Sequence, residues 1–117
     1  MISEVLTEIE PRVFGLFELN DEGTILYSRS DSGASSNEAL RQLTGRNFFD
    51  EAAPFENTDE FRHYVNRFIR SNDPSEIFNF NCRIKNQDIP AKIKLVRIIE
   101  RSSDERARTT IVDIRRA

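Results

Sequence analysis

Between Phe78 and Ile84 the sequence alternates strictly between apolar and polar side chains. The apolar positions are Phe78, Phe80, Cys82 and Ile84, and the positions between them are Asn79, Asn81 and Arg83. Successive side chains of a β-strand point to opposite faces, so a period of two is typical of a strand with one buried face. The segment therefore predicts a half-buried strand, with Cys82 directed toward the core.

Four further segments are predicted to be strands. Apolar runs at residues 13–19 and 24–28 are joined by Asn20, Asp21, Glu22 and Gly23, and turn-forming residues between two such runs predict a hairpin. Residues 91–99 and 110–117 supply the last two strands. The segment 86–90 is expected to separate the alternating strand from the next one, and residues 100–109 are expected to form a charged loop.

Two capping-box patterns predict helices in the middle of the chain. Ser35 followed by Glu38 predicts a short helix that Gly45 would close, and Asn57 followed by Glu60 predicts a longer one that ends near Ser71. The longer helix has an apolar stripe made of Phe61, Tyr64, Val65, Phe68 and Ile69. We expect Phe61, Val65 and Phe68 to face the core.

The order of these elements predicts the fold class. Two strands, a helical middle and three strands give an α+β protein, with a five-stranded antiparallel sheet and short helices on one side. We assign residues 12–117 to this domain and residues 1–11 to an N-terminal amphipathic helix that Pro11 ends.

The N-terminal helix carries an apolar stripe that needs a cover. Its members are Ile2, Val5, Leu6 and Ile9, with Glu4, Glu8 and Glu10 on the other face. A helix of about nine residues is not stable in water unless it packs against something. The cover is either the chain's own sheet or another subunit, and we expect a homodimer through these four residues.

Composition narrows the functional classes. The chain has 117 residues, enough for one domain, and a net charge of -3, which offers no general attraction to nucleic acid or to an anionic membrane. It has one cysteine, no run of eighteen apolar residues and no signal-peptide pattern at its start. These features predict a cytoplasmic protein.

The residues that carry chemistry in enzymes do not form a catalytic pattern here. His63 is the only histidine, and no second metal ligand follows it at helical spacing. Asp50 and Glu51 are adjacent, so they do not face each other as an acid/base pair. We therefore expect a protein that is not an enzyme and binds no metal.

Several segments resemble the PAS family, and specifically its photoactive yellow protein branch. The matching pieces are "FGLFELNDEGTIL", "LTGRNFFDEAAP", "TDEF", "IFNFNCRI", "PAKIKL" and "IVDIRRA". They cover most of the chain from about residue 13 to its end, and "GRNFF" followed by "AAP" is the most specific pair. The resemblance implies a five-stranded sheet and short helices around one small pocket.

The resemblance also implies the loss of the family's photochemistry. In photoactive members the residue after the "AP" pair is a cysteine that carries p-coumaric acid, and here that residue is Phe55. The tyrosine and glutamate that bind the phenolate oxygen would fall on Ser28 and Ser32, and their neighbours on Ser36 and Glu38. We therefore expect no covalent p-coumaric acid and no other cofactor.

Two functions remain open from the sequence. The first is a non-photoactive sensory or interaction module that acts in signal transduction through protein contacts, dimerisation and an unidentified effector. The second is a receptor that binds a metabolite non-covalently. Its pocket would be lined by Ser28, Ser32, Ser36, Phe48, Phe55, Phe61, Val65, Phe68, Phe80 and Cys82.

Overall fold

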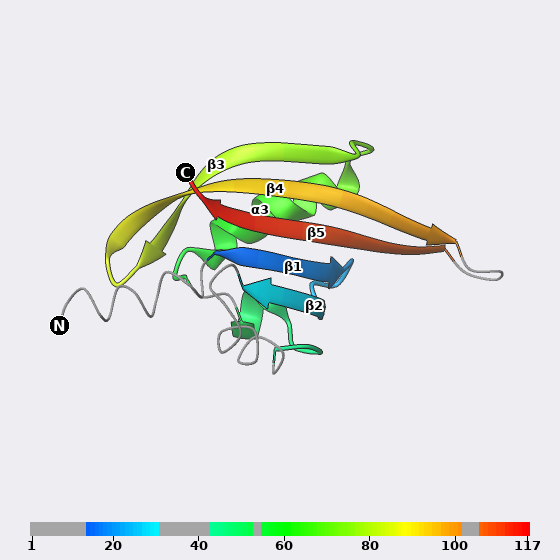
Figure 1. Cartoon of the computed structure of the whole chain (residues 1–117), viewed down its shortest axis with the longest axis horizontal. Coiled ribbons are helices and arrows are strands. Elements are labelled where there is room, and N and C mark those ends of the chain that lie inside the picture. Colours follow the sequence, from blue (N-terminus) through cyan, green and yellow to red (C-terminus); the bar gives the residue numbers. More distant parts are fainter. Residues whose placement is uncertain (1–13, 31–42, 53–54, 102–105) are drawn as a thin grey trace.

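The computed structural model describes residues 14–30, 43–52, 55–101 and 106–117. They form one antiparallel sheet of five strands in the order β2-β1-β5-β4-β3. The strands are β1 (Gly15–Asn20), β2 (Ile25–Ser30), β3 (Ser75–Ile84), β4 (Gln87–Arg101) and β5 (Arg106–Arg116). The predicted α+β class is confirmed, since α3 (Thr58–Arg70) and the short π-helical turn η1 (Phe48–Ala52) accompany the sheet (Figure 1).

The predicted N-terminal helix cannot be compared with the structure. Ile2, Val5, Leu6 and Ile9 lie outside the described residues, and so do Ser32, Ser36 and the predicted short helix up to residue 42. The boundary between residues 11 and 12 stays a prediction for the same reason.

The turn between β1 and β2 is stabilised by the side chain of Asn20. Its Oδ1 accepts hydrogen bonds from the backbone N–H of Glu22 (3.0 Å) and of Thr24 (2.9 Å). Gly23 completes the turn with a φ of 89°, a conformation that glycine adopts without steric cost. The hairpin expected from the turn-forming residues is confirmed.

The expected break at residues 86–90 is wrong. The turn consists of Lys85 and Asn86, whose φ angles are 49° and 63°, and β4 begins at Gln87. Pro90 lies within β4 with its nitrogen and carbonyl on the side of β5, and the carbonyl accepts a hydrogen bond from the Ala117 N–H (3.3 Å). The missing N–H of Pro90 therefore removes no hydrogen bond from the β3–β4 ladder.

The expected charged loop at residues 100–109 is also shorter than predicted. β4 continues to Arg101 and β5 starts at Arg106, with Arg101 paired to Arg106 in the ladder. The sequence does not indicate these two strand ends, because charged residues are unfavourable in strands by themselves. Antiparallel pairing between β4 and β5 stabilises them.

The inner face of the sheet packs against α3 and η1 to form the core. Side chains that are fully buried come from every layer, including Phe17, Leu19, Ile25, Phe48, Phe61, Val65, Phe68, Ile93, Leu95, Val112 and Ile114. The predicted stripe of α3 is confirmed, because Phe61, Val65 and Phe68 are buried and Tyr64 and Ile69 are partly buried against the same cluster.

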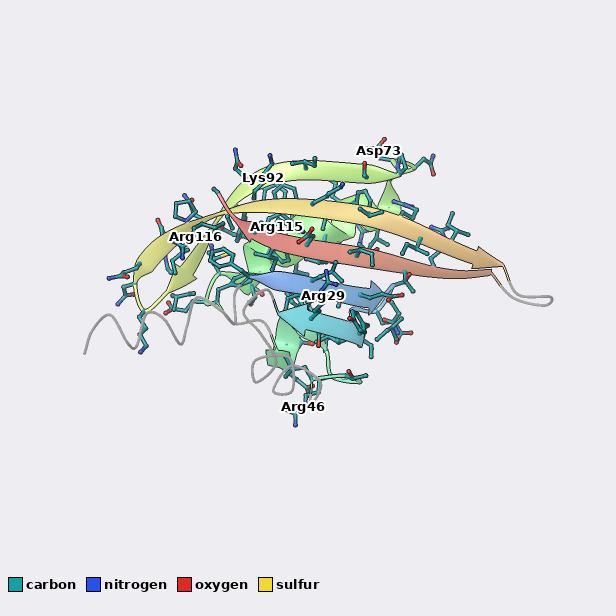
Figure 2. The ribbon with its side chains drawn as sticks, viewed as in Figure 1. Arg29, Arg46, Asp73, Lys92, Arg115 and Arg116 are labelled. Carbon is teal, nitrogen blue, oxygen red and sulfur yellow. The ribbon has the colours of Figure 1, made fainter. Side chains whose placement is uncertain are left out.

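The outer face of the sheet carries charged side chains beside a small apolar group. Half-buried Val96 and Ile111 pair across β4 and β5, and Lys94 pairs with Asp113 one step along. Lys92 lies directly opposite Arg115 on the same face (Figure 2). Asp113 accepts the Arg115 guanidinium at 3.2 Å, so this face holds a small network of charges around an apolar centre.

Candidate functional site

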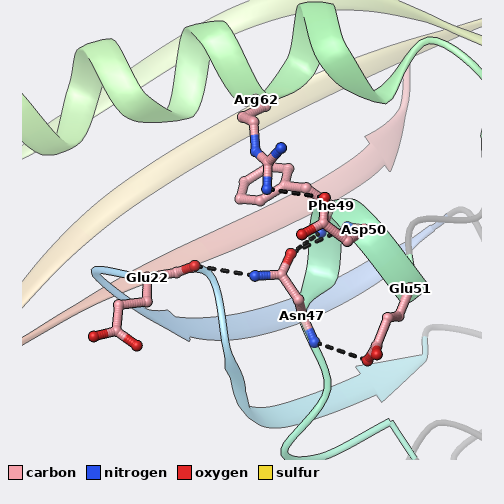
Figure 3. Close-up of polar contacts among 6 residues, drawn as sticks. All are labelled: Glu22, Asn47, Phe49, Asp50, Glu51 and Arg62. Atoms are coloured by element: carbon pink, nitrogen blue, oxygen red, sulfur yellow. Dashed lines mark hydrogen bonds and ion pairs between the residues drawn. The ribbon is translucent and has the colours of Figure 1, made fainter.

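The candidate site lies between the β1–β2 turn and α3, at residues 47–52 and 55–57. Asn47 fixes the start of this segment (Figure 3). Its Oδ1 accepts hydrogen bonds from the N–H groups of Phe49 (2.9 Å) and Asp50 (3.1 Å), and its Nδ2 donates to the carbonyl of Glu22 (3.1 Å). Asn47 thus caps η1 and binds it to the turn.

A second set of contacts binds η1 to α3. The guanidinium of Arg62 forms an ion pair with Asp50 at 3.1 Å and lies 5.1 Å from the centre of the Phe49 ring (Figure 3). A Cβ atom on Gly23 would lie 3.0 Å from the Phe49 ring, so the turn needs glycine there for space as well as for its φ. The turn, η1 and α3 therefore form one packed unit.

Phe55 is a core residue in this arrangement. Its side chain is 5% exposed, and its ring centre lies 5.4 Å from that of Phe61 on α3 and 6.0 Å from that of Phe80 on β3. Phe61 and Phe80 contact each other edge to face at 5.3 Å. The Phe55 ring therefore occupies the junction between α3 and β3, where aromatic contacts add to burial.

The residues after Phe55 pair with the edge of β3. Glu56 donates its N–H to the carbonyl of Arg83 (2.7 Å) and accepts the Lys85 N–H at its Oε1 (2.7 Å). Asn57 donates from Nδ2 to the carbonyl of Asn81 (2.7 Å) and accepts the Arg83 N–H at Oδ1 (2.9 Å).

Asn57 therefore does not form the predicted capping box. It precedes α3 but makes no side-chain cap, because its amide binds β3 instead. The Asn57 side chain forms hydrogen bonds to β3 in place of the helix cap that its spacing from Glu60 predicts. The same two bonds also place Phe55 against β3.

The cysteine is buried and chemically quiet. Cys82 is 0% exposed on the inner face of β3, and burial raises the pKa of its thiol to about 12. Because of this raised pKa, the Cys82 thiol is protonated at neutral pH, whereas the thiolate is the reactive form of cysteine. The interpretation of Cys82 as a core side chain is confirmed.

Seven of the ten predicted pocket residues belong to one apolar cluster. They are Phe48, Phe55, Phe61, Val65, Phe68, Phe80 and Cys82. Ser28 is buried on β2, opposite Phe17 in the β1 ladder. Their role as a ligand pocket stays a prediction. His63 is exposed on α3.

Arg97 is a residue that sequence reasoning missed. It projects from β4 to the end of α3, where its guanidinium donates to the carbonyls of Phe68 and Ile69 and lies 4.9 Å from the Phe68 ring centre. Carbonyls at a helix end lack partners within the helix, and a cation there is favourable. The sequence gives no indication of this helix-capping role, because Arg97 is one of several charged residues in β4.

A surface groove of about 330 Å³ lies between the start of α3 and the edge of β3. Polar side chains dominate its lining, among them Asn57, Glu60, Asn79, Asn81 and Arg83. Among the residues that the structure describes, no group of His, Cys, Asp or Glu is placed to hold a metal ion. No helix in the described part of the chain is long and apolar enough to cross a membrane.

Comparison with known proteins agrees with this architecture. The PAS domain of BvgS from Bordetella pertussis superposes with a TM-score of 0.59 at 9% identity, over 99% of this chain and 85% of that chain. The photoactive yellow protein domain of the sensor histidine kinase Ppr from Rhodospirillum centenum gives a TM-score of 0.54 at 18% identity, over 85% and 89% of the two chains. The protein therefore has the fold of a PAS domain.

The sequence is also distantly similar to that of a known protein. Photoactive yellow protein from Rhodothalassium salexigens is 26% identical over 92 residues, which cover 79% of this chain and 74% of that protein. No family model matches the sequence. The chain has the fold of a PAS domain and distant sequence similarity to photoactive yellow protein.

Proposed function

We propose that this PAS domain is a sensory or signalling module that acts through protein contacts and carries no covalent p-coumaric acid. The observation that supports this most is the position of Phe55. The resemblance puts the chromophore cysteine at this residue, and the Phe55 ring is 5% exposed between Phe61 and Phe80. A phenyl ring offers no nucleophile for a thioester.

Cys82 does not replace the missing attachment point in this proposal. Its thiol is buried on β3, and its pKa of about 12 keeps it protonated. Acylation requires a thiolate that the reagent can reach. The scaffold of the family is therefore kept while its photochemistry is lost.

The proposed contacts include dimerisation through the N-terminal segment. Ile2, Val5, Leu6 and Ile9 form an apolar stripe in the sequence, and the outer face of the sheet offers half-buried Val96 and Ile111 as an apolar centre. Acidic Glu4 and Glu8 complement basic Lys92 and Lys94 on that face. Leu6→Glu with Ile9→Glu in the full chain should then weaken self-association through this surface, as measured by sedimentation equilibrium.

The alternative is a receptor for a small metabolite. The buried Ser28 hydroxyl on β2 is the observation that favours it, since a mostly apolar pocket needs a few polar groups to orient a ligand. The position of Phe55 weighs against the receptor, because its ring fills core space that a bound ligand would need.

Native mass spectrometry of freshly purified protein separates the two functions. The interaction module predicts the mass of the unmodified chain or of its dimer. A stoichiometric small-molecule adduct that denaturation releases would establish the receptor instead, and an adduct that survives denaturation would contradict the proposal on p-coumaric acid.

A further inference from the structure

The two halves of the β3 edge differ in their hydrogen bonds to the described part of the chain. β3 is the outermost strand on its side of the sheet (Figure 1). In its second half, Glu56 and Asn57 bind the outward backbone groups of Asn81 and Arg83. Backbone groups of a strand point alternately toward and away from its neighbour, so Ser75, Ile77 and Asn79 share this outward direction.

The first half of the edge is open among the described residues. No hydrogen bond reaches the outward N–H or carbonyl groups of Ile77 and Asn79 from any described part of the chain. Exposed edges are usually protected by a proline, a bulge or a charged side chain, and residues 75–79 contain no proline and no bulge. Their one charged residue, Glu76, points to the inner face and is paired with Arg67. Pro74 bounds the open stretch on one side, and the Asn57 contact with Asn81 bounds it on the other.

An exposed apolar side chain lies at the centre of this stretch. Ile77 is 57% exposed, the most exposed large apolar side chain among the described residues. The open stretch runs over five residues, and Ile77 is its midpoint. The centre of the open edge therefore carries an exposed apolar side chain that a partner strand could cover.

We propose that the β3 edge pairs with the β3 edge of a second copy of this chain, in an antiparallel ladder centred on Ile77. A two-fold axis at Ile77 pairs Ser75 with Asn79 of the second copy and Ile77 with its own counterpart. Every outward residue then meets an outward residue, so all the open backbone groups are used. The two five-stranded sheets become one continuous sheet.

The side chains around the axis suit this pairing. On the outer face, Ile77 packs against Ile77 of the other copy and loses its exposed surface. On the inner face, Glu76 lies opposite Phe78, so no like charges meet. Arg67 on α3 binds Glu76 at 3.4 Å, and two such pairs beside the axis would alternate in sign.

Charge substitutions at Ile77 in the full chain test the proposal. Sedimentation equilibrium of the wild type over a wide concentration range should show reversible dimers. Ile77→Lys and Ile77→Glu place like charges opposite each other, and each should weaken self-association by about tenfold or more. An equimolar mixture of the two variants should associate more tightly than either alone, because opposite charges then meet at the axis.

Two controls separate this interface from the others. Ile99→Lys changes another exposed isoleucine, 44% exposed at the far end of β4, and should leave association at the wild-type level. Amide hydrogen exchange at Ile77 and Asn79 should slow as protein concentration rises in the wild type and not in Ile77→Lys. This readout requires β3 pairing itself, so a general loss of folding would not reproduce it.

Three results would overturn the inference. A wild type that stays monomeric at the highest concentration refutes it. So does a dimer that Ile77→Lys leaves intact and that Leu6→Glu with Ile9→Glu abolishes, since that dimer uses the N-terminal segment of the proposed function. The third is a mixture of Ile77→Lys and Ile77→Glu that associates no better than either variant. If instead the Ile77 variants alone abolish association, the edge pairing stands and the proposed N-terminal interface fails.

Discussion

The two faces of the sheet use their side chains in opposite ways. The inner face is filled by aromatic rings from four elements, with Phe61 in contact with the rings of Phe48, Phe49, Phe55, Phe78 and Phe80. The outer face carries charged residues beside an apolar pair, as Asp113 lies beside Ile111. The described inner face is filled by packed side chains, whereas the outer face and the β3 edge leave side chains and backbone groups exposed.

Phe61→Ala should produce the largest effect because its ring is the centre of the inner-face cluster. Removal of a fully buried phenylalanine costs about 3 to 5 kcal/mol of unfolding free energy. Phe68→Ala, also fully buried on α3, should fall in the same range. Urea unfolding measures both, with Ile99→Ala at an exposed isoleucine of β4 as the matched control.

That comparison has a clear failure. If Phe61→Ala and Ile99→Ala shift the unfolding midpoint equally, the inner face is not the packed core described above. A large effect at Phe61 with none at Phe68 would mean that only the first half of α3 supports the core.

Arg97→Met should destabilise the end of α3 by about 1 to 3 kcal/mol. The guanidinium donates to the carbonyls of Phe68 and Ile69, and hydrogen bonds from a charged group are among the stronger ones. Methionine keeps the length and apolar stem but leaves these carbonyls without that donor. Arg97→Lys should recover part of the loss, and an unchanged stability in both variants would remove Arg97 from the account.

Asn57→Ala should cost about 1 kcal/mol, since it removes two hydrogen bonds that water replaces in part. Asn57→Asp keeps the acceptor for the Arg83 N–H and loses only the donor to Asn81, so its effect should be smaller. Hydrogen exchange at the Arg83 amide reports the contact directly. Equal protection in wild type and Asn57→Ala would show that the side chain does not hold this edge.

Arg83→Gln should have the smallest effect, within about 0.5 kcal/mol. Its ion pair with Asp88 spans 3.3 Å between two side chains that are both more than half exposed. Solvent screens such pairs, so thermal unfolding at low and high salt should give nearly the same difference from wild type. A loss of stability as large as that of Asn57→Ala would contradict the expectation that an exposed ion pair stabilises the fold less than the Asn57 hydrogen bonds do.

The sequence predicts most of the fold because its strongest patterns are long. The alternation from Phe78 to Ile84 and the stripe from Phe61 to Ile69 both report directly which side of an element is buried. Strand ends are less visible, since Asp88 and Pro90 are unfavourable in strands by themselves. Pairing with β3 and the end of β5 decide their conformation.

The candidate site is harder to predict because its organising contacts are distant in sequence. Asn57 has the spacing of a helix cap and instead binds residues 24 and 26 positions away. Asn47 contacts Glu22 across 25 positions, and η1 is too short to show a helical period. Phe55 was identified only through the resemblance, since its neighbours give no pattern that distinguishes a core ring from an attachment point.

The most direct test of the account is reaction with an activated p-coumaroyl ester. Wild type should gain no covalent adduct, because Phe55 has no nucleophile and the pKa of the Cys82 thiol is about 12. Phe55→Cys, with Cys82→Ser as a background control, should take up one p-coumaroyl group. We expect this adduct to absorb in the near ultraviolet, because Ser28 and Ser32 are weaker partners for a phenolate than tyrosine and glutamate.

A visible band should appear only when Ser28→Tyr and Ser32→Glu are added to Phe55→Cys. Short hydrogen bonds from these side chains would then stabilise the buried phenolate. Intact mass reports whether each protein carries the p-coumaroyl group, and absorption spectra report whether the bound group is ionised. A yellow adduct on the wild-type chain, or on Phe55→Cys alone, would contradict the claim that Phe55 stands where the family carries its pigment.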